Sequence, residues 1–189
     1  MFPINDLTEI WHEIEARDGC AGADGITVSD FACRAKSNLK ALLLELNSGA
    51  YKSSPVRHIK LRNQDGSQRR ISILSVRDRI AHRAVKDAVV AVLDKSISPS
   101  CHSYRIGYGV KSAAAVVRDA SKNGFSWAAS CDIEKYFDNI DVMMLLEATD
   151  RHLPPELAKA VRGCIEPLSS NGYGIPQGSP LSPVLSNFY

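Results

Sequence analysis

The chain has 189 residues, enough for one domain or two small ones with a buried core. Hydrophobic residues make up 44% of the sequence and charged residues 23%, with 12 glycines and 9 prolines. This composition excludes disordered, collagen-like and disulfide-stapled proteins. The net charge of +2 neither requires nor excludes a nucleic-acid partner.

The cysteines and the apolar stretches indicate in which cellular compartment the protein is located. The five cysteines are odd in number, form no Cys-x-x-Cys pair and lie at least 13 residues apart, so neither a disulfide framework nor a zinc ribbon fits. We expect reduced thiols and a cytoplasmic location. The N-terminus lacks the basic start and apolar run of a signal peptide, and no apolar stretch approaches the roughly 20 residues of a membrane span. We therefore expect no membrane partner.

Charge is distributed unevenly along the chain. Residues 51–111 contain 13 Lys and Arg but only 4 Asp, a balance of +9, so the rest of the chain carries −7. This layout is typical of a protein with one surface for phosphates and another for metal-binding carboxylates. For the bases within residues 77–86, a solvated helix face is an equally good interpretation.

Hydrophobic spacing predicts the first elements. Apolar residues at 7, 10, 11 and 14 predict a helix with Asp6 as its cap, and a glycine-rich loop follows at 21–25. Residues 29–46 predict a second helix that ends at Gly49. Residues 56–61 and 69–73 then predict a β-hairpin whose turn contains Asp65-Gly66.

Beyond the hairpin, one strand is expected among several helices. Residues 127–133 predict a buried strand, and the segments at 97–109 and 172–180 predict a loop and a rigid turn. Helical spacing recurs in four segments, which are residues 76–93, 110–120, 141–146 (with Asp141 at the start) and 155–165.

The end of the predicted strand and the residues after it contain candidates for chemistry. Asp132 closes the predicted strand beside the carbonyl of Ile133, and both offer the hard oxygen ligands that Mg²⁺ prefers. A helix cap or turn is the commoner role of such an aspartate. Phe137, five residues beyond Asp132, suits either a ring beside a nucleotide sugar or a core aromatic.

The other candidates lie on the hairpin and on the rigid turn. Arg69 suits bidentate contact with a triphosphate, or it is a solvated charge on an edge strand. Gln177 lies between Pro176, which stiffens the backbone, and Gly178, which lets it approach a ligand closely. Each of these residues is ambiguous alone.

Five blocks in order resemble the reverse transcriptases of bacterial retroelements, in particular the group II intron type. Each block alone is weak evidence, but their order makes the resemblance specific. The blocks are AGADGIT at 21–27, RRISI at 69–73 with VRDRI at 76–80, YRIG at 104–107, CDIEKYFDNI at 131–140 and GIPQGSPLSP at 174–183.

The resemblance implies a fold and a reaction. The fold is an α+β right-hand polymerase fragment, with helix-rich fingers carrying a β-hairpin at 1–110 and an incomplete palm at 111–189. The reaction of the complete enzyme is RNA-directed DNA polymerisation, in which a primer 3′-hydroxyl attacks a dNTP with the help of two Mg²⁺ ions, or Mn²⁺. The expected partners are an RNA template, a DNA primer and the dNTP.

The resemblance also assigns roles to individual residues. Asp132 is the implied catalytic residue and binds the metal together with the carbonyl of Ile133. Phe137 rejects a ribose 2′-hydroxyl. The remaining implied contacts are Arg69 with the triphosphate, Gln177 and Gly178 with the nucleotide and template, and Arg57, Lys60 and Arg105 with nucleic-acid phosphates.

One family block is missing from the sequence. In the family, a Tyr/Phe-x-Asp-Asp hairpin follows the Pro-Gln-Gly block and supplies the second catalytic acid, whereas this sequence ends at Tyr189 and contains no Asp-Asp pair. Because two-metal transfer needs carboxylates on both sides of the ions, we expect these 189 residues alone to be inactive. They would be a truncated product, an engineered fragment or one part of a split enzyme.

Two alternatives stay open at the level of the sequence. One is a non-catalytic RNA-binding or maturase-like module, and the other is an abortive-infection-type defence protein. For any of them, missing palm strands should leave apolar surface uncovered around residues 127–133 and along the C-terminal helix. This predicts marginal stability, self-association or binding to the missing palm and thumb.

Overall fold

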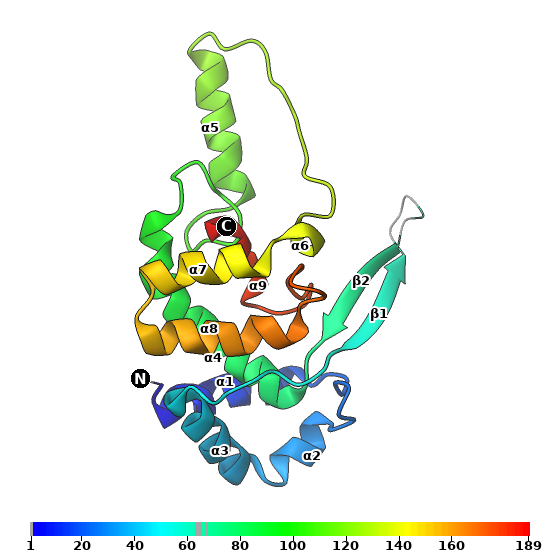
Figure 1. The fold of residues 1–189 in the computed structure, drawn as a ribbon. Helices are drawn as coiled ribbons and strands as arrows, with labels where there is room; N and C mark the ends of the chain where they lie inside the picture. The colour runs from blue at the N-terminus through cyan, green and yellow to red at the C-terminus, as the bar shows by residue number, and fades with distance from the viewer. Residues whose placement is uncertain (1, 63–65, 67) are drawn as a thin grey trace.

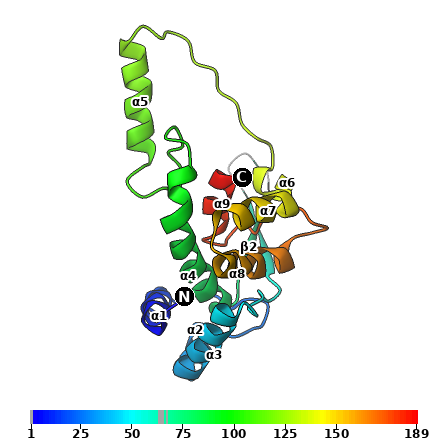
Figure 2. The same ribbon diagram turned by 60° about the vertical axis from the view of Figure 1, so that its left-hand side comes forward.

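In the computed structural model, which describes residues 2–62, 66 and 68–189, a helical body carries two projections (Figure 1). One projection is a two-stranded β-hairpin, and the other is a single helix, α5 (Val110–Lys122), which stands apart from the body in both Figure 1 and Figure 2. The fold is α+β and rich in helix, as predicted.

The N-terminal part contains three helices where the sequence predicts two. They are α1 (Ile4–Arg17), α2 (Val28–Ala32) and α3 (Ala35–Ser48). The helix predicted over 29–46 is interrupted because the backbone of Arg34 is not helical. The bend places Phe31 against Trp11, with ring centroids 4.8 Å apart.

The ends of these helices follow from their local chemistry. Pro3, rather than the predicted Asp6, precedes the first residue of α1. Asp6 lies in the first turn instead, where a carboxylate is stabilised by the positive end of the helix dipole. Gly49 ends α3 with a φ of 73°, as predicted, because glycine adopts this left-handed conformation without steric cost.

The hairpin forms where the sequence predicts it. Strands β1 (Arg57–Arg62) and β2 (Gln68–Ile73) are antiparallel, with Arg57 opposite Ile73 and Arg62 opposite Gln68. All six residues of β1 are exposed, whereas the end of β2 is buried against the body. Asp65 of the predicted turn lies outside the described residues.

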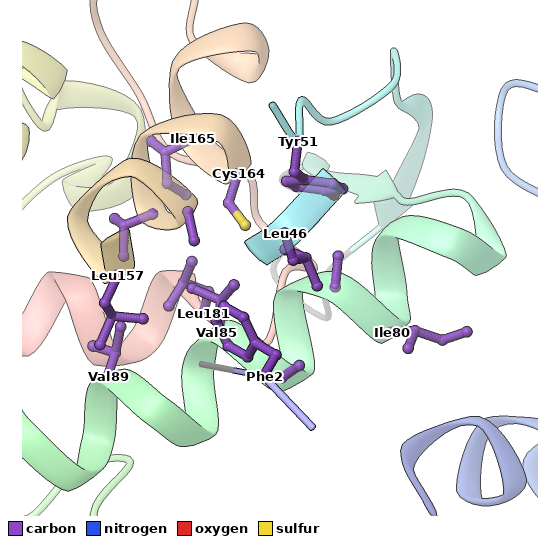
Figure 3. Close-up of a cluster of buried hydrophobic side chains, with 14 of the residues drawn as sticks. Phe2, Leu46, Tyr51, Ile80, Val85, Val89, Leu157, Cys164, Ile165 and Leu181 are labelled. Carbon is purple, nitrogen blue, oxygen red and sulfur yellow. The ribbon is translucent and has the colours of Figure 1, made fainter. Parts of the chain in front are cut away.

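Helix α4 (Val76–Leu93) lies at the centre of the body and packs against α1, α8 and α9. Figure 3 shows Val85 and Val89 of α4 close to Leu157 of α8 and to Leu181. These residues belong to one buried cluster that also includes Leu7 near the N-terminus. Residues on both sides of position 110 build this core, and the division into fingers at 1–110 and palm at 111–189 stays a prediction.

The remaining elements complete the body. A short 3₁₀ helix, η1, follows α4, and α8 and α9 pack against α4 while α7 packs against α8. Their bounds are η1 (Asp94–Ser96), α6 (Tyr136–Asn139), α7 (Val142–His152), α8 (Pro155–Ile165), η2 (Glu166–Leu168) and α9 (Ser182–Phe188). Asp141 caps α7, as predicted, and accepts a hydrogen bond from the Met144 N–H.

The strand predicted at 127–133 is absent. Residues 125–133, called here the Asp132 segment, are irregular and exposed, and the Trp127 side chain is 95% exposed. No strand among the described residues lies beside this segment, so its backbone groups have no ladder to join. The predicted uncovered apolar surface is therefore confirmed here.

The same prediction is wrong for the C-terminal helix. Val184 and Leu185 of α9 are buried, and α9 packs against α4. The reason is that the apolar face of α9 is already buried against the core of the body, so no further palm strand is needed to cover it.

The structure bears on the state of the cysteines and on membrane-spanning helices. All five cysteines are free thiols, and only Cys164 is fully buried. None of the helices in the described residues is long and apolar enough to cross a membrane.

Candidate nucleotide-binding site

The Pro-Gln-Gly turn (residues 174–180) is fastened to the second strand of the hairpin. The Ser72 N–H donates a hydrogen bond of 2.6 Å to the carbonyl of Gln177. Arg69 Nε donates a second, of 2.9 Å, to Oε1 of the same glutamine, 108 residues away in sequence. Two residues that the sequence predicts separately as nucleotide contacts are therefore in direct contact.

Gly178 is required by this close approach. Its φ is +129°, and a Cβ atom at this position would lie 2.2 Å from the carbonyl oxygen of Ser72. A side chain would collide with the backbone of β2, which cannot rotate away as a flexible side chain would. Glycine therefore allows the turn to reach the hairpin.

The turn is also joined to the block that contains Phe137. The Ile175 N–H donates to the Phe137 carbonyl at 3.0 Å, and the Gly174 N–H donates to the Ile140 carbonyl at 2.9 Å. The Phe137 side chain is half-buried and packs against the core cluster. The structure thus brings Arg69, Gln177, Gly178 and the Phe137 backbone to one place.

A cavity of about 220 Å³ opens between the hairpin and the turn. Its volume is below the roughly 300 Å³ at which pockets that enclose a whole drug-sized ligand usually begin. Burial and the nearby Arg70 lower the pKa of His58, which keeps this imidazole neutral at pH 7. The cavity combines cationic, anionic, polar and apolar side chains, and its lining includes His58, Arg70, Ser72, Asp138, Tyr173 and Gln177.

A buried polar network behind the turn was not predicted from the sequence. Asp78 is fully buried, accepts a hydrogen bond of 2.8 Å from the Tyr51 hydroxyl and accepts another from the Ser54 N–H. Burial raises the pKa of Tyr51, which keeps it a hydrogen-bond donor. His82, one turn further along α4, is also fully buried. The only signal in the sequence was two polar residues at core positions of a helical pattern.

The predicted nucleic-acid contacts differ in their surroundings. Arg57 and Lys60 are exposed on β1, and neither forms an ion pair within the described residues. The contact of both residues with nucleic-acid phosphates stays a prediction.

The nucleic-acid contact of Arg105 stays a prediction, and Arg105 is paired within the molecule. Its side chain is only 8% exposed, forms an ion pair of 2.8 Å with Asp94 and lies over the Tyr108 ring. This pairing lowers the pKa of Asp94 and raises that of Arg105. Arg105 fixes the loop at 97–109 to the end of α4, since its guanidinium also donates to the carbonyls of Asp94 and Ser98.

Asp132 and Ile133 lie on the exposed Asp132 segment, and among the described residues no hydrogen bond ties either one to the turn. No group of three or more His, Cys, Asp or Glu side chains within the described ranges is placed to hold a metal ion. The carboxylate and the neighbouring carbonyl are hard oxygen donors, and they suit one Mg²⁺ held jointly with substrate phosphates. A second ion would require further carboxylates.

The described residues form a helical body with a basic hairpin, to which the Pro-Gln-Gly turn is fastened. Residues 61–189, more than half of the chain, match the family described as "Reverse transcriptase (RNA-dependent DNA polymerase)". The chain belongs to the reverse transcriptase family.

Several proteins are similar to this chain along most of its length. Protein YkfC of Escherichia coli is 25% identical over 88% of the chain and 47% of that protein. The group II intron-encoded protein LtrA of Lactococcus lactis is 24% identical over 82% of the chain and 27% of that protein. The putative COX1/OXI3 intron 1 protein of Saccharomyces cerevisiae is 27% identical over 79% of the chain and 19% of that protein.

The intron-encoded relatives support the group II intron type of reverse transcriptase. Among solved structures, a chain of the "Partial Cas6-RT-Cas1--Cas2 complex" superposes with a TM-score of 0.57 at 21% identity, covering 99% of this chain and 32% of the other. This likeness shows that the fold is shared. The chain spans between 19% and 47% of the length of the curated relatives it matches.

Proposed function

We propose that this chain forms the nucleotide-binding and template-binding part of an RNA-directed DNA polymerase. The observation that carries the proposal is the contact between Arg69 on the hairpin and Gln177 on the Pro-Gln-Gly turn. This contact orients a guanidinium and a glutamine toward one region of the surface, beside a cavity that also contains Arg70. A triphosphate requires such fixed cationic donors.

The roles of the residues follow from their chemistry. Arg69 would bind phosphate oxygens through the N–H groups that Gln177 does not use, and Phe137 would contact the sugar with its accessible edge. Asp132 and the Ile133 carbonyl would hold Mg²⁺, which neutralises charge that develops on the phosphates. The primer 3′-hydroxyl would attack the α-phosphorus, the bond to the β-phosphate oxygen would break, and pyrophosphate would leave.

A reconstitution experiment tests this function. Primer extension would be measured on an RNA template annealed to a DNA primer, with this chain alone and with a second chain that carries a Tyr/Phe-x-Asp-Asp hairpin. We expect no extension by the 189 residues alone, because Asp132 is their single predicted catalytic carboxylate. Extension should appear in the mixture and should fall at least about a thousandfold with Asp132→Asn.

A matched control separates catalysis from a general effect of charge. Asp119→Asn removes an exposed carboxylate from α5 and should leave extension in the mixture unchanged. Extension by the isolated chain at the rate of an intact enzyme would contradict the incomplete site. RNA binding without extension in any mixture would favour the non-catalytic module instead.

The nucleic-acid surface can be tested separately. Lys60→Glu should weaken RNA binding and lower the slope of log affinity against log salt by about 1, because one phosphate contact is lost. Lys40→Glu, an exposed charge reversal on α3, is the matched control and should leave the slope unchanged. Equal effects of the two variants would indicate non-specific attraction rather than a hairpin surface.

A further inference from the structure

His82 connects two distant parts of the molecule through hydrogen bonds. The ring is fully buried, with Nε2 at 2.7 Å from the Ser53 hydroxyl and Nδ1 at 2.7 Å from the Ser179 hydroxyl. Ser53 precedes the hairpin, and Ser179 belongs to the Pro-Gln-Gly turn. His82 is therefore the link between them in the core.

The donors and acceptors in this network have a fixed direction. The Ser53 hydroxyl donates to the carbonyl of Cys164 at 3.0 Å, so its oxygen accepts the hydrogen bond from Nε2–H of His82. Nδ1 of the neutral ring then accepts from the Ser179 hydroxyl, whose oxygen accepts from the Leu181 N–H at 3.1 Å. Every polar atom along this path is satisfied when His82 is neutral.

The electrostatics agree with this assignment. Burial lowers the pKa of His82 to about 4, and the nearby Asp78 carboxylate offsets only part of that effect. The ring is therefore neutral at pH 7, with Nδ1 free to accept.

The turn is thus held from two sides. On its outer side, β2 binds Gln177 through Ser72 and Arg69. On its inner side, His82 binds Ser179, two residues after Gln177, while Ser182 donates to the carbonyl of Pro176 at 2.8 Å. A shift of Ser179 would be transmitted through Gly178, which has no room to move toward Ser72.

We propose that His82 is a positioning residue that sets the place of the Pro-Gln-Gly turn and thereby of Gln177 at the nucleotide site. The effect on nucleotide binding rests on the proposed function, whereas the effect on the turn does not. His82 itself has no exposed surface with which to touch a ligand.

Two substitutions of His82 separate its two hydrogen bonds. The short amide of His82→Asn can replace Nδ1 and keep the bond to Ser179, whereas the longer amide of His82→Gln can replace Nε2 and keep only the bond to Ser53. We expect amide hydrogen exchange at Ser72 and Leu181 to be about tenfold faster in His82→Gln. The dissociation constant for dATP with Mg²⁺ should rise by about the same factor. In His82→Asn, the exchange rates and the dissociation constant should both stay close to those of the wild type.

Further variants decide between positioning and a merely structural role. Ser53→Ala breaks the other end of the network and should lower overall stability without faster exchange at Leu181. Equal acceleration in Ser53→Ala and His82→Gln would overturn the proposal. Should either histidine variant fail to fold, Ser179→Ala removes the same bond from the turn and must accelerate exchange at Ser72. Should the wild-type chain not bind dATP, the proposed function fails, and exchange at Ser72 still decides whether His82 positions the turn.

Discussion

The Pro-Gln-Gly turn and the Asp132 segment are the two blocks that the sequence predicts as the centre of an active site, yet only the turn is held by hydrogen bonds to the rest of the body. Hydrogen bonds from β2 hold the turn on one side, and His82 holds it on the other. The Asp132 segment is exposed along residues 125–133 and joins no strand in the described part of the chain.

The difference lies in where each block finds its partners. The turn satisfies its polar groups with α4, α6 and the hairpin, all of which this chain supplies. A strand must satisfy its backbone groups with a neighbouring strand, and the described residues offer none beside the Asp132 segment. The proposed nucleotide contacts can therefore be preformed while the proposed metal ligands are not.

The largest effect should come from filling the contact between the turn and β2. Gly178→Ala places a Cβ 2.2 Å from the Ser72 carbonyl oxygen and should lower the free energy of unfolding by at least about 3 kcal/mol. Gly124→Ala, before the Asp132 segment, is the control, because its φ is also positive, +93°, but its surroundings are open. It should cost about 1 kcal/mol. Urea unfolding measures both, and equal losses would contradict the comparison.

Acid should lower the free energy of unfolding through His82, which holds the Pro-Gln-Gly turn. The pKa of His82 is lowered to about 4 by burial, against about 6.5 in the unfolded chain. Between these values the unfolded state binds more protons, so stability falls as the pH decreases from 6.5 to 4, by roughly 3 kcal/mol in total. The titratable groups of the same buried network are Asp78, Tyr51 and Cys164, and burial raises the pKa of the latter two, so they stay neutral in this range.

His82→Asn should remove this part of the pH dependence. Urea unfolding at pH 7, 6, 5 and 4 would compare the two proteins, and the stability advantage of the wild type should shrink toward pH 4. Parallel curves for the two proteins would show that His82 does not titrate on unfolding.

The contact between hairpin and turn should affect ligand binding more than stability. Arg69→Lys removes the Nε donor to Gln177 and should weaken dATP binding about tenfold, or ~1.4 kcal/mol. The free energy of unfolding should change by less than about 0.5 kcal/mol, because Arg69 is exposed. Arg62→Lys at the far end of β1 is the matched control, and an equal loss of affinity there would argue against a specific site.

The smallest effect on stability should come from the exposed Asp132 segment. The protein has two tryptophans, and Trp127 is 95% exposed while Trp11 is 3% exposed. Trp127→Ala should change the free energy of unfolding by less than about 0.5 kcal/mol, whereas Trp11→Ala should cost about 3–5 kcal/mol.

Trp127→Ala should also reduce self-association, which sedimentation would measure. The Asp132 segment exposes Phe125, Trp127 and Ile133, and α5 exposes Val116 and Val117. Exposed apolar surface of this kind favours association. A wild-type monomer with a high melting temperature would contradict this prediction.

The basic segment at 51–111 shows how far charge patterns can be trusted. Its excess of positive charge is visible in the sequence, but Arg77, Arg83 and Arg105 form ion pairs with acids of the same molecule. Arg57 and Lys60 on the hairpin are exposed instead. The composition gives the number of basic residues, whereas the packing of the helices decides which of them are paired with acidic residues.

The sequence by itself determined the family, the hairpin and most helices, because the spacing of apolar residues and the order of the five blocks are local properties of the chain. It also singled out Arg69, Gln177 and Gly178. Only the tertiary structure decided that these residues meet, that Arg105 is an internal anchor and that residues 127–133 form no strand. Each of these outcomes depends on partners distant in sequence: the Pro-Gln-Gly turn for Arg69, Asp94 for Arg105, and a neighbouring strand for the Asp132 segment.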